Sequence, residues 1–219
     1  GRYNYPIAWS PDSKWIAFTQ GLDNANNAVF MFDVENKKSH QVTSGFYEDF
    51  NPVFSTDGKY LFYLTNRNFD AVYSDMDDGT WVYPNSTQIA SLSLTKDTPS
   101  LLQPKNDALE AKEEKPENDE KKDEEKKEAE VEIKVDFDNL EARIVILPPK
   151  AGNMGGLIPF QSKLVYERNP NTGSGERSSS LVYYDLEERK EENIISDVDY
   201  FVAAADGKSL LVRSKGTYG

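Results

Sequence analysis

His40 is the only histidine of the chain and therefore the first residue to consider for catalysis. A nucleophilic triad needs a serine, a base and an orienting acid within hydrogen-bond reach. His40 follows the charged turn Asn36-Lys37-Lys38 in an expected outer strand, and the equivalent position of a later repeat is Glu192. The sequence has no Gly-x-Ser-x-Gly elbow and no phosphate-binding glycine loop. We therefore interpret His40 as a surface strand residue and predict no catalytic residue in this chain.

The segment Asp75-Met76-Asp77-Asp78-Gly79 superficially resembles a calcium-binding loop. Its glycine is one place early, and no glutamate follows at the spacing that such a loop requires. Other carboxylates are abundant because the net charge is −13, and none of them stands out as half of an acid–base pair. The sequence therefore predicts no metal site and no cofactor.

The elements that would have to position any site are repeated β-hairpins. Each copy is a short apolar strand, a polar turn and a second strand rich in aromatic and branched residues; the copies span residues 7–18, 51–63 and 201–212. The turns contain Asp12, Asp57 and Asp206, whose side chains can accept hydrogen bonds from the backbone ahead. Gly58 and Gly207 can adopt a positive φ there without steric cost. The pattern predicts hairpins.

Two repeat signatures in phase indicate propeller blades. Asp12 and Asp57 are 45 residues apart, close to the ~40–45 residues of a four-stranded blade. Residues 32–38 match residues 184–190 at an offset of 152, and both copies lead into a short apolar strand. Unrelated hairpins would not be expected to share both signatures. The sequence thus predicts an all-β fold, a partial β-propeller of three to four four-stranded antiparallel blades.

The repeats set the expected domain boundaries. We expect a first blade at 1–45, the first three strands and long loop of a second at 46–104, a charged insertion at 105–130, completion of the second blade at 131–150, a third blade at 151–198 and the first hairpin of a fourth at 199–219. Residues 143–147 are the expected outer strand of the second blade, and residues 131–138 alternate like a strand.

Aromatic residues suggest both a core and a candidate binding loop. We predict that Trp9, Phe18, Phe30 and Phe32 belong to the core between blades. The loop at 65–84 is long and, with Tyr63 just upstream, contains Phe69, Tyr73, Trp81 and Tyr83. Loops of this length with apolar anchors tend to be functional or to pack on a neighbour.

The charged insertion contains seven lysines and twelve acidic residues, a net charge of −5. Such a segment cannot bury enough apolar area to offset its ordering entropy. We expect a disordered or marginally helical surface insertion, with a role as a binding tail as the alternative.

Composition restricts the partners. A net charge of −13 argues against binding to nucleic acid or to anionic membranes, and no apolar run is long enough to span a bilayer. The absence of cysteine excludes disulfides without fixing a compartment, so we expect a soluble protein of unknown localisation. A repeat begins almost at residue 1 and another is barely complete at Gly219, so we expect the chain to be a fragment of a larger propeller. A partial ring would leave sheet faces and edges exposed, and we therefore expect the isolated chain to self-associate or to be poorly soluble.

The turn motif Ser-Pro-Asp-(Ser/Gly)-Lys resembles the repeats of TolB and of peptidase-associated propellers. Further segments resemble the second propeller of tricorn-type serine peptidases; they are residues 41–54, 72–75, 97–100, 135–143 and 148–153. The run Asp136-Phe137-Asp138-Asn139-Leu140-Glu141-Ala142-Arg143 after an acidic insertion is the most specific. The resemblance covers nearly the whole chain outside the charged insertion.

The resemblance implies a role. In that family a six-bladed and a seven-bladed propeller precede a catalytic region with a PDZ domain, which hydrolyses peptides with a serine nucleophile. The second propeller is regarded as a substrate filter, and no catalytic residue of the family maps onto this chain. We expect a non-catalytic segment that gates or guides peptides, with the remaining blades, the catalytic and PDZ region, peptides and a second copy as partners. A TolB-like interaction scaffold with no peptidase attached is the alternative; a self-sufficient hydrolase has little support.

Overall fold

The computed structural model describes residues 7–74, 80–104, 132–204, 207 and 209–219. The charged insertion at 105–130, the calcium-like segment at 75–79 and Asp206 lie outside the described residues, so our predictions for them are not addressed below.

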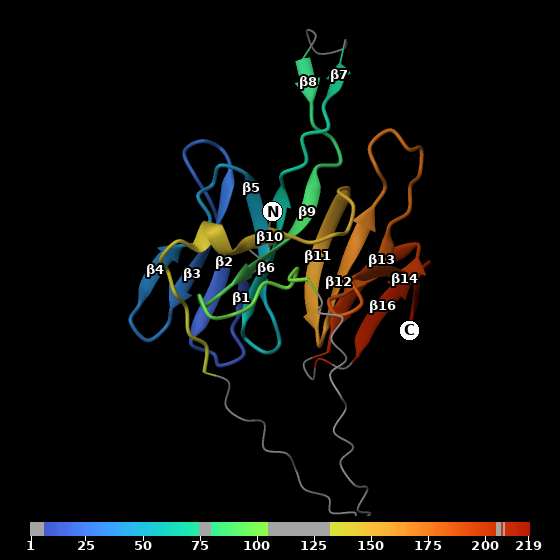
Figure 1. Ribbon diagram of the computed structural model, residues 1–219. Coiled ribbons are helices and arrows are strands. Elements are labelled where there is room, and N and C mark those ends of the chain that lie inside the picture. Colours follow the sequence, from blue (N-terminus) through green and yellow to red (C-terminus); the bar gives the residue numbers. More distant parts are fainter. Residues whose placement is uncertain (1–6, 75–79, 105–131, 205–206, 208) are drawn as a thin grey trace, which may run out of the picture.

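Four antiparallel sheets follow one another along the chain like blades of a fan (Figure 1). The first contains β1 (Ile7–Trp9), β2 (Trp15–Gly21), β3 (Asn27–Asp33) and β4 (Lys38–Gln41). The second contains β5 (Glu48–Phe54), β6 (Tyr60–Asn66), β9 (Thr87–Ser93) and β10 (Ile144–Ile146). The third contains β11 (Asn153–Phe160), β12 (Lys163–Asn169), β13 (Ser180–Asp185) and β14 (Lys190–Ser196), and the fourth β15 (Val198–Ala203), β16 (Leu210–Ser214) and β17 (Thr217–Tyr218).

Each strand of these sheets pairs with the next strand of the same sheet, which is the order of a propeller blade. A separate two-stranded hairpin, β7 (Val72–Ser74) and β8 (Thr80–Val82), is inserted between β6 and β9. The predicted all-β partial propeller is confirmed. In the described part of the chain the one helix is the four-residue 3-10 helix η1 (Leu140–Arg143), and no helix there has the length and apolar character needed to cross a bilayer.

The hairpin turns of the first two blades have matching hydrogen bonds. Ser10 Oγ donates to Asp12 at 2.6 Å, and Ser55 Oγ donates to Asp57 at the same distance. In both turns the backbone N–H two residues after the aspartate bonds its carboxylate at 3.1 Å. The N–H five residues after the serine bonds the serine oxygen at 2.9 Å. The turn residues thus satisfy backbone donors that the tight reversal leaves without strand partners.

The second repeat signature also has one structure in both copies. Asp33 accepts a hydrogen bond from the backbone of Asn36 at 2.8 Å, and Asp185 accepts two from the backbone of Glu187 and Glu188 at 2.9 Å. The aspartate at the end of the third strand therefore caps the turn that leads to the outer strand.

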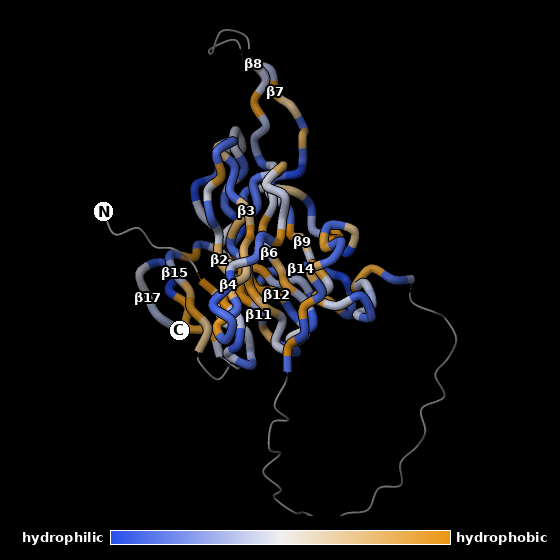
Figure 2. The backbone as a smooth tube through the Cα atoms, turned by 90° about the vertical axis from the view of Figure 1, so that its left-hand side faces the viewer, coloured by the Kyte–Doolittle hydropathy of each residue, from blue (hydrophilic) through white to orange (hydrophobic). Residues whose placement is uncertain are grey.

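The core lies between the sheets rather than at the centre of one sheet. Hydrophobic residues are concentrated along the central strands, such as β6 and β12 (Figure 2). Ala17, Val29 and Met31 of the first sheet are fully buried with Leu61 and Tyr63 of the second. The opposite face of the second sheet packs on the third through a cluster that includes Phe62, Leu64, Ile89, Leu164 and Tyr166. A smaller cluster joins the third sheet to the fourth. Central sheets are therefore buried on both faces, as β6 is.

The predicted core role of Trp9, Phe18, Phe30 and Phe32 is wrong for the contact between the first two sheets. Neighbouring strand residues point to opposite faces, and the face that packs on the second sheet holds the alternate residues Ala17, Val29 and Met31. Trp9 is 53% exposed, and the three phenylalanines are only partly buried. Sequence alternation identified the apolar strands but not which face meets the next blade.

The strand expected at 143–147 is present as β10, which pairs with β9 and completes the second sheet after the charged insertion. The strand expected at 131–138 is not formed at 132–137. Its alternation has another cause: Ile133, Val135 and Phe137 pack against the core of the first two sheets. The backbone of this segment is held by isolated hydrogen bonds instead of a strand ladder. In one of them Ile133 N donates to a carboxylate oxygen of Asp12 at 2.9 Å.

Candidate functional site

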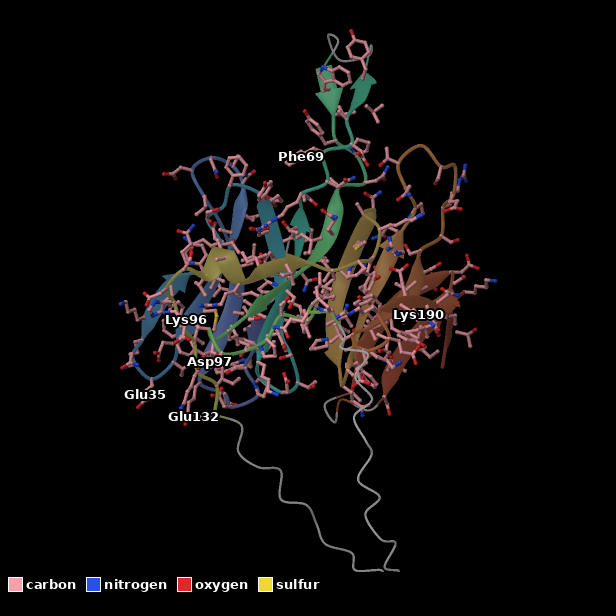
Figure 3. The ribbon with its side chains drawn as sticks, in the orientation of Figure 1. Glu35, Phe69, Lys96, Asp97, Glu132 and Lys190 are labelled. Carbon is pink, nitrogen blue, oxygen red and sulfur yellow. The ribbon has the colours of Figure 1, made fainter. Side chains whose placement is uncertain are left out.

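The long loop after β6 projects from one end of the sheets as the β7–β8 hairpin (Figure 3). We did not predict a hairpin inside this loop, because its strands are three residues each. Tyr73 pairs with Trp81 across the hairpin, and their rings meet edge to face with centroids 5.5 Å apart. Both side chains are more than half exposed. The cross-strand aromatic pair thus stabilises the short β7–β8 hairpin, and both rings remain accessible to a partner.

Four further aromatic residues form a continuous surface at the base of this hairpin. We call Phe46, Tyr47, Phe69 and Tyr83 the aromatic shelf. Ring centroids are 4.9 Å apart for Phe46 and Tyr47, 5.8 Å for Tyr47 and Phe69, and 5.6 Å for Phe69 and Tyr83. Phe46, Phe69 and Tyr83 are each at least half exposed. An exposed apolar surface made of contacting side chains is typical of an interaction site.

The connection between the first and second sheets holds Phe46 in a fixed place. Side-chain amides of Asn24 and Asn26 donate to the carbonyl of Gly45 at 2.9 and 3.0 Å, and Asn26 also donates to the carbonyl of Phe46 at 3.1 Å. Gly45 has φ 75° and packs so closely on Leu22 that a Cβ would clash. Phe46 is nevertheless 73% exposed. A rigid backbone that presents a large apolar ring loses little entropy when a partner binds.

A buried polar network lies against the shelf. The guanidinium of Arg67 is 4.5 Å from the centroid of the Tyr47 ring, a cation–π distance. Arg67 Nε donates to Thr65 Oγ1 at 2.9 Å, and Thr65 in turn donates to the carboxylate of Asp49. Asp49 is 1% exposed, and its oxygen lies 3.6 Å from an Arg67 nitrogen. Burial raises the pKa of Asp49, while Thr65 and Arg67 oppose this effect. The network thus fixes Arg67 beneath an aromatic ring.

His40 lies in β4 and makes aromatic contacts. Its ring stacks on Phe137 with centroids 4.0 Å apart and is tilted against Trp15 at 6.3 Å. The side chain is partly buried. Among the described residues no group of three or more His, Asp or Glu side chains could hold a metal ion. His40 therefore packs among aromatic rings, and the aromatic shelf is the candidate functional site.

The opposite end of the sheets contains a cleft of about 790 Å³ between the second and third sheets. Its apolar lining includes Tyr60, Phe62, Leu101 and Leu186, and Asp57 and Lys59 line it at the turn of the second hairpin. Tyr60 donates its hydroxyl to the carbonyl of Pro99 at 2.8 Å. Lys96, Asp97 and Glu132 lie at this end (Figure 3). Charges of both signs surround it, so it favours no one class of ligand.

Sequence reasoning identified part of the shelf. The length and aromatic content of the loop at 65–84 point to Phe69 and Tyr83, but they do not point to Phe46, Tyr47 or Arg67. The missed residues flank the second sheet, at the beginning of β5 and the end of β6, and only antiparallel pairing brings these strand ends together. The sequence signal that could have found them is the pair Phe46-Tyr47 directly after Ser44-Gly45 in a polar connection.

Comparison with known proteins gives one consistent result. The sequence matches the family model "Tricorn protease second beta propeller domain" over residues 3–219. Tricorn protease homolog 1 of Streptomyces coelicolor is 28% identical over 221 residues, which cover 96% of this chain and 20% of the relative. Tricorn protease of Thermoplasma volcanium is 26% identical over 213 residues, 94% of this chain and 19% of the relative. The chain spans about a fifth of the length of these relatives.

Solved structures agree on the fold. The crystal structure of the tricorn protease superposes with a TM-score of 0.71 at 19% identity, covering 95% of this chain and 20% of that chain. TolB from Acinetobacter baumannii gives a TM-score of 0.53 at 14% identity, covering 97% of this chain and 38% of that chain.

Proposed function

Because this chain belongs to the family of tricorn protease second β-propeller domains, we propose that it guides peptide substrates as a non-catalytic propeller segment of a tricorn-like serine peptidase. In this proposal the bond-breaking residues lie in a catalytic region outside the chain. The remaining blades, the catalytic region with its PDZ domain and a second copy of the protein are its partners.

The observation that supports a guiding role is the aromatic shelf. The Asn24 and Asn26 amides hold the backbone carbonyls at Gly45 and Phe46, and Arg67 lies against the Tyr47 ring. Phe46, Phe69 and Tyr83 nevertheless face solvent. A monomer gains nothing in stability from leaving large rings in water, so a partner that covers them is the simpler explanation. Peptides suit such a surface because aromatic side chains offer large contact area with little entropy to lose.

A second observation supports incorporation into a larger ring of blades. The outer face of the first sheet presents Ile7 and Trp9, which are 57% and 53% exposed. The fourth sheet likewise exposes Tyr200, Val202 and Leu211. Both faces are apolar in the way that the buried faces between sheets are, which favours further blades on either side.

The test is peptide hydrolysis by the full-length protein that contains this chain, compared with the 219-residue chain alone. We expect turnover by the full-length protein, inhibition of that turnover by a serine-directed probe, and no labelling of the chain by the same probe. Labelling of the chain itself, or a full-length protein without peptidase activity, would refute the proposal. The second outcome would favour a TolB-like interaction scaffold, for which the superposition on TolB is the supporting observation.

A further inference from the structure

The β7–β8 hairpin places free strand edges beside the exposed rings of the shelf. Within the described residues β7 pairs only with β8, so each strand has one edge without a strand partner. Tyr83 directly follows β8, and Phe69 precedes β7 by three residues. A backbone edge beside side-chain contact sites is the arrangement that binds an added strand.

The spacing of the shelf fits an extended chain. Centroids along Tyr47, Phe69 and Tyr83 are separated by 5.8 and 5.6 Å. Side chains on one face of a strand recur about every 6.6 Å, twice the rise per residue. Alternate side chains of a bound strand could therefore each contact a ring, while the backbone between them bonds an edge of the hairpin.

The charge at this end selects among peptides. The described residues of segments 22–26, 44–49, 66–74 and 80–84 contain four carboxylates and one guanidinium, that of Arg67, which already lies opposite Asp49. Lys150 lines a neighbouring pocket together with Asp70, so carboxylates outnumber cationic groups at this end by four to two. The exposed carboxylates are those of Asp23 and Asp70. Negative potential and exposed ring faces both attract ammonium and guanidinium groups. An acidic peptide would be repelled by the same surface.

We propose that the β7–β8 hairpin and the aromatic shelf together bind an extended basic peptide segment, in which lysine or arginine alternates with apolar residues. The peptide adds a strand to the hairpin and places its apolar side chains on the shelf, while its cationic side chains project from the opposite face of the strand within the negative potential of this end. This inference rests on the proposed function and specifies the surface and the peptide chemistry that the guiding role uses.

The test uses three short fluorescent peptides and the 219-residue chain. One alternates leucine with lysine, one alternates leucine with glutamate, and the third is the lysine peptide N-methylated at alternate residues so that one backbone edge cannot bond. We expect the lysine peptide to bind most tightly by fluorescence anisotropy. Each of the other two should bind at least about tenfold more weakly, because charge attraction or the backbone ladder is lost.

The matched variants are Phe69→Ala with Tyr83→Ala on the shelf and Tyr200→Ala with Tyr218→Ala on the fourth sheet. All four side chains are at least half exposed, and Tyr200 and Tyr218 are remote in sequence from the shelf. The shelf pair should weaken binding of the lysine peptide about tenfold or more, and the control pair by less than about twofold. Phe46→Ser, at a 73% exposed position, repeats the test should the shelf pair alter thermal unfolding.

Three results would contradict binding of a basic peptide at the shelf. Tight binding of the lysine peptide that the shelf variants leave unchanged overturns this inference and leaves peptide guiding intact. Absence of binding by every peptide overturns the inference, and the hydrolysis test with the full-length protein then decides separately whether the proposed function stands. Self-association that the shelf variants abolish, without peptide binding, identifies the surface as a contact between copies and also overturns the inference.

Discussion

The guanidinium of Arg67 lies 4.5 Å from the centroid of the Tyr47 ring, so a buried polar network stands directly behind the exposed aromatic shelf. Through Thr65 the same guanidinium is linked to Asp49, which is almost fully buried. The stability of the fold and the geometry of the shelf therefore depend on the same few side chains.

Arg67→Ala should destabilise the chain by about 1–3 kcal/mol, because it leaves the Asp49 carboxylate buried with fewer partners. Urea unfolding measures the change. Arg213→Ala is the matched control, since its guanidinium also lies over a tyrosine ring, that of Tyr218, but on an exposed strand. We expect less than about 0.5 kcal/mol there. An Arg67 variant as stable as the control would show that the network does not support the fold.

Exchanging residues between the two matching turns should shift stability in opposite directions. Ser13 has φ 59° where the second turn has Gly58 at φ 69°. A left-handed backbone costs a serine more than a glycine, so Ser13→Gly should stabilise the chain by about 0.5–1 kcal/mol. Gly58→Ser should destabilise it by a similar amount. Thermal unfolding of both variants provides the measurement, and a shift of equal sign in the two would contradict the shared turn geometry.

Acid should weaken the third blade through Asp185. Its hydrogen bond from Lys163, at 2.7 Å, and the bonds from two backbone N–H groups lower the pKa of Asp185 to about 2. Because the folded-state pKa is below the unfolded value of about 3.9, this stabilisation is present above about pH 4 and is lost as pH falls toward 2.

Asp185→Asn removes the charge and keeps an acceptor for the backbone donors. The difference in unfolding free energy between wild type and this variant should be constant near neutral pH and shrink between about pH 4 and pH 2. Lys163→Met should reduce the same pH dependence, since the main cause of the lowered pKa is removed. A difference that does not change over this interval would contradict the assignment to Asp185.

The outer face of the first sheet should make the isolated chain self-associate. Ile7 and Trp9 are both more than half exposed on an apolar sheet face. Sedimentation velocity should show association that increases with concentration and is reduced by Ile7→Thr with Trp9→Thr. Tyr200→Thr on the fourth sheet tests whether the second exposed face contributes. A monodisperse wild-type monomer over a wide concentration range would contradict this prediction.

The repeated turns explain why so much of the fold was predictable. Asp12 and Asp57 each accept a hydrogen bond from a backbone N–H two residues further on, so the sequence alone indicates where each hairpin reverses. Strand register within a blade follows from those turns. The outer strand β10 could also be placed, because its spacing to the next hairpin matches that of the third blade.

Contacts between blades could not be predicted in the same way. Trp9 and Ala8 are neighbours on one strand, and only packing decides which of them meets the second sheet. The aromatic shelf could not be predicted for the same reason. Tyr47 and Phe69 are distant in sequence and become neighbours only through the pairing of β5 with β6. Local chemistry specified the hairpins, whereas long-range packing determined the surface.

Photo-cross-linking in the full-length protein during peptide hydrolysis tests the central claim most directly. A benzophenone amino acid replaces Phe69 on the shelf or, in a separate protein, Tyr200 on the fourth sheet, and a basic peptide is the substrate. The account predicts peptide turnover and substantially more peptide attached at position 69 than at position 200. Equal attachment at both positions, or a protein that does not hydrolyse the peptide, would contradict it.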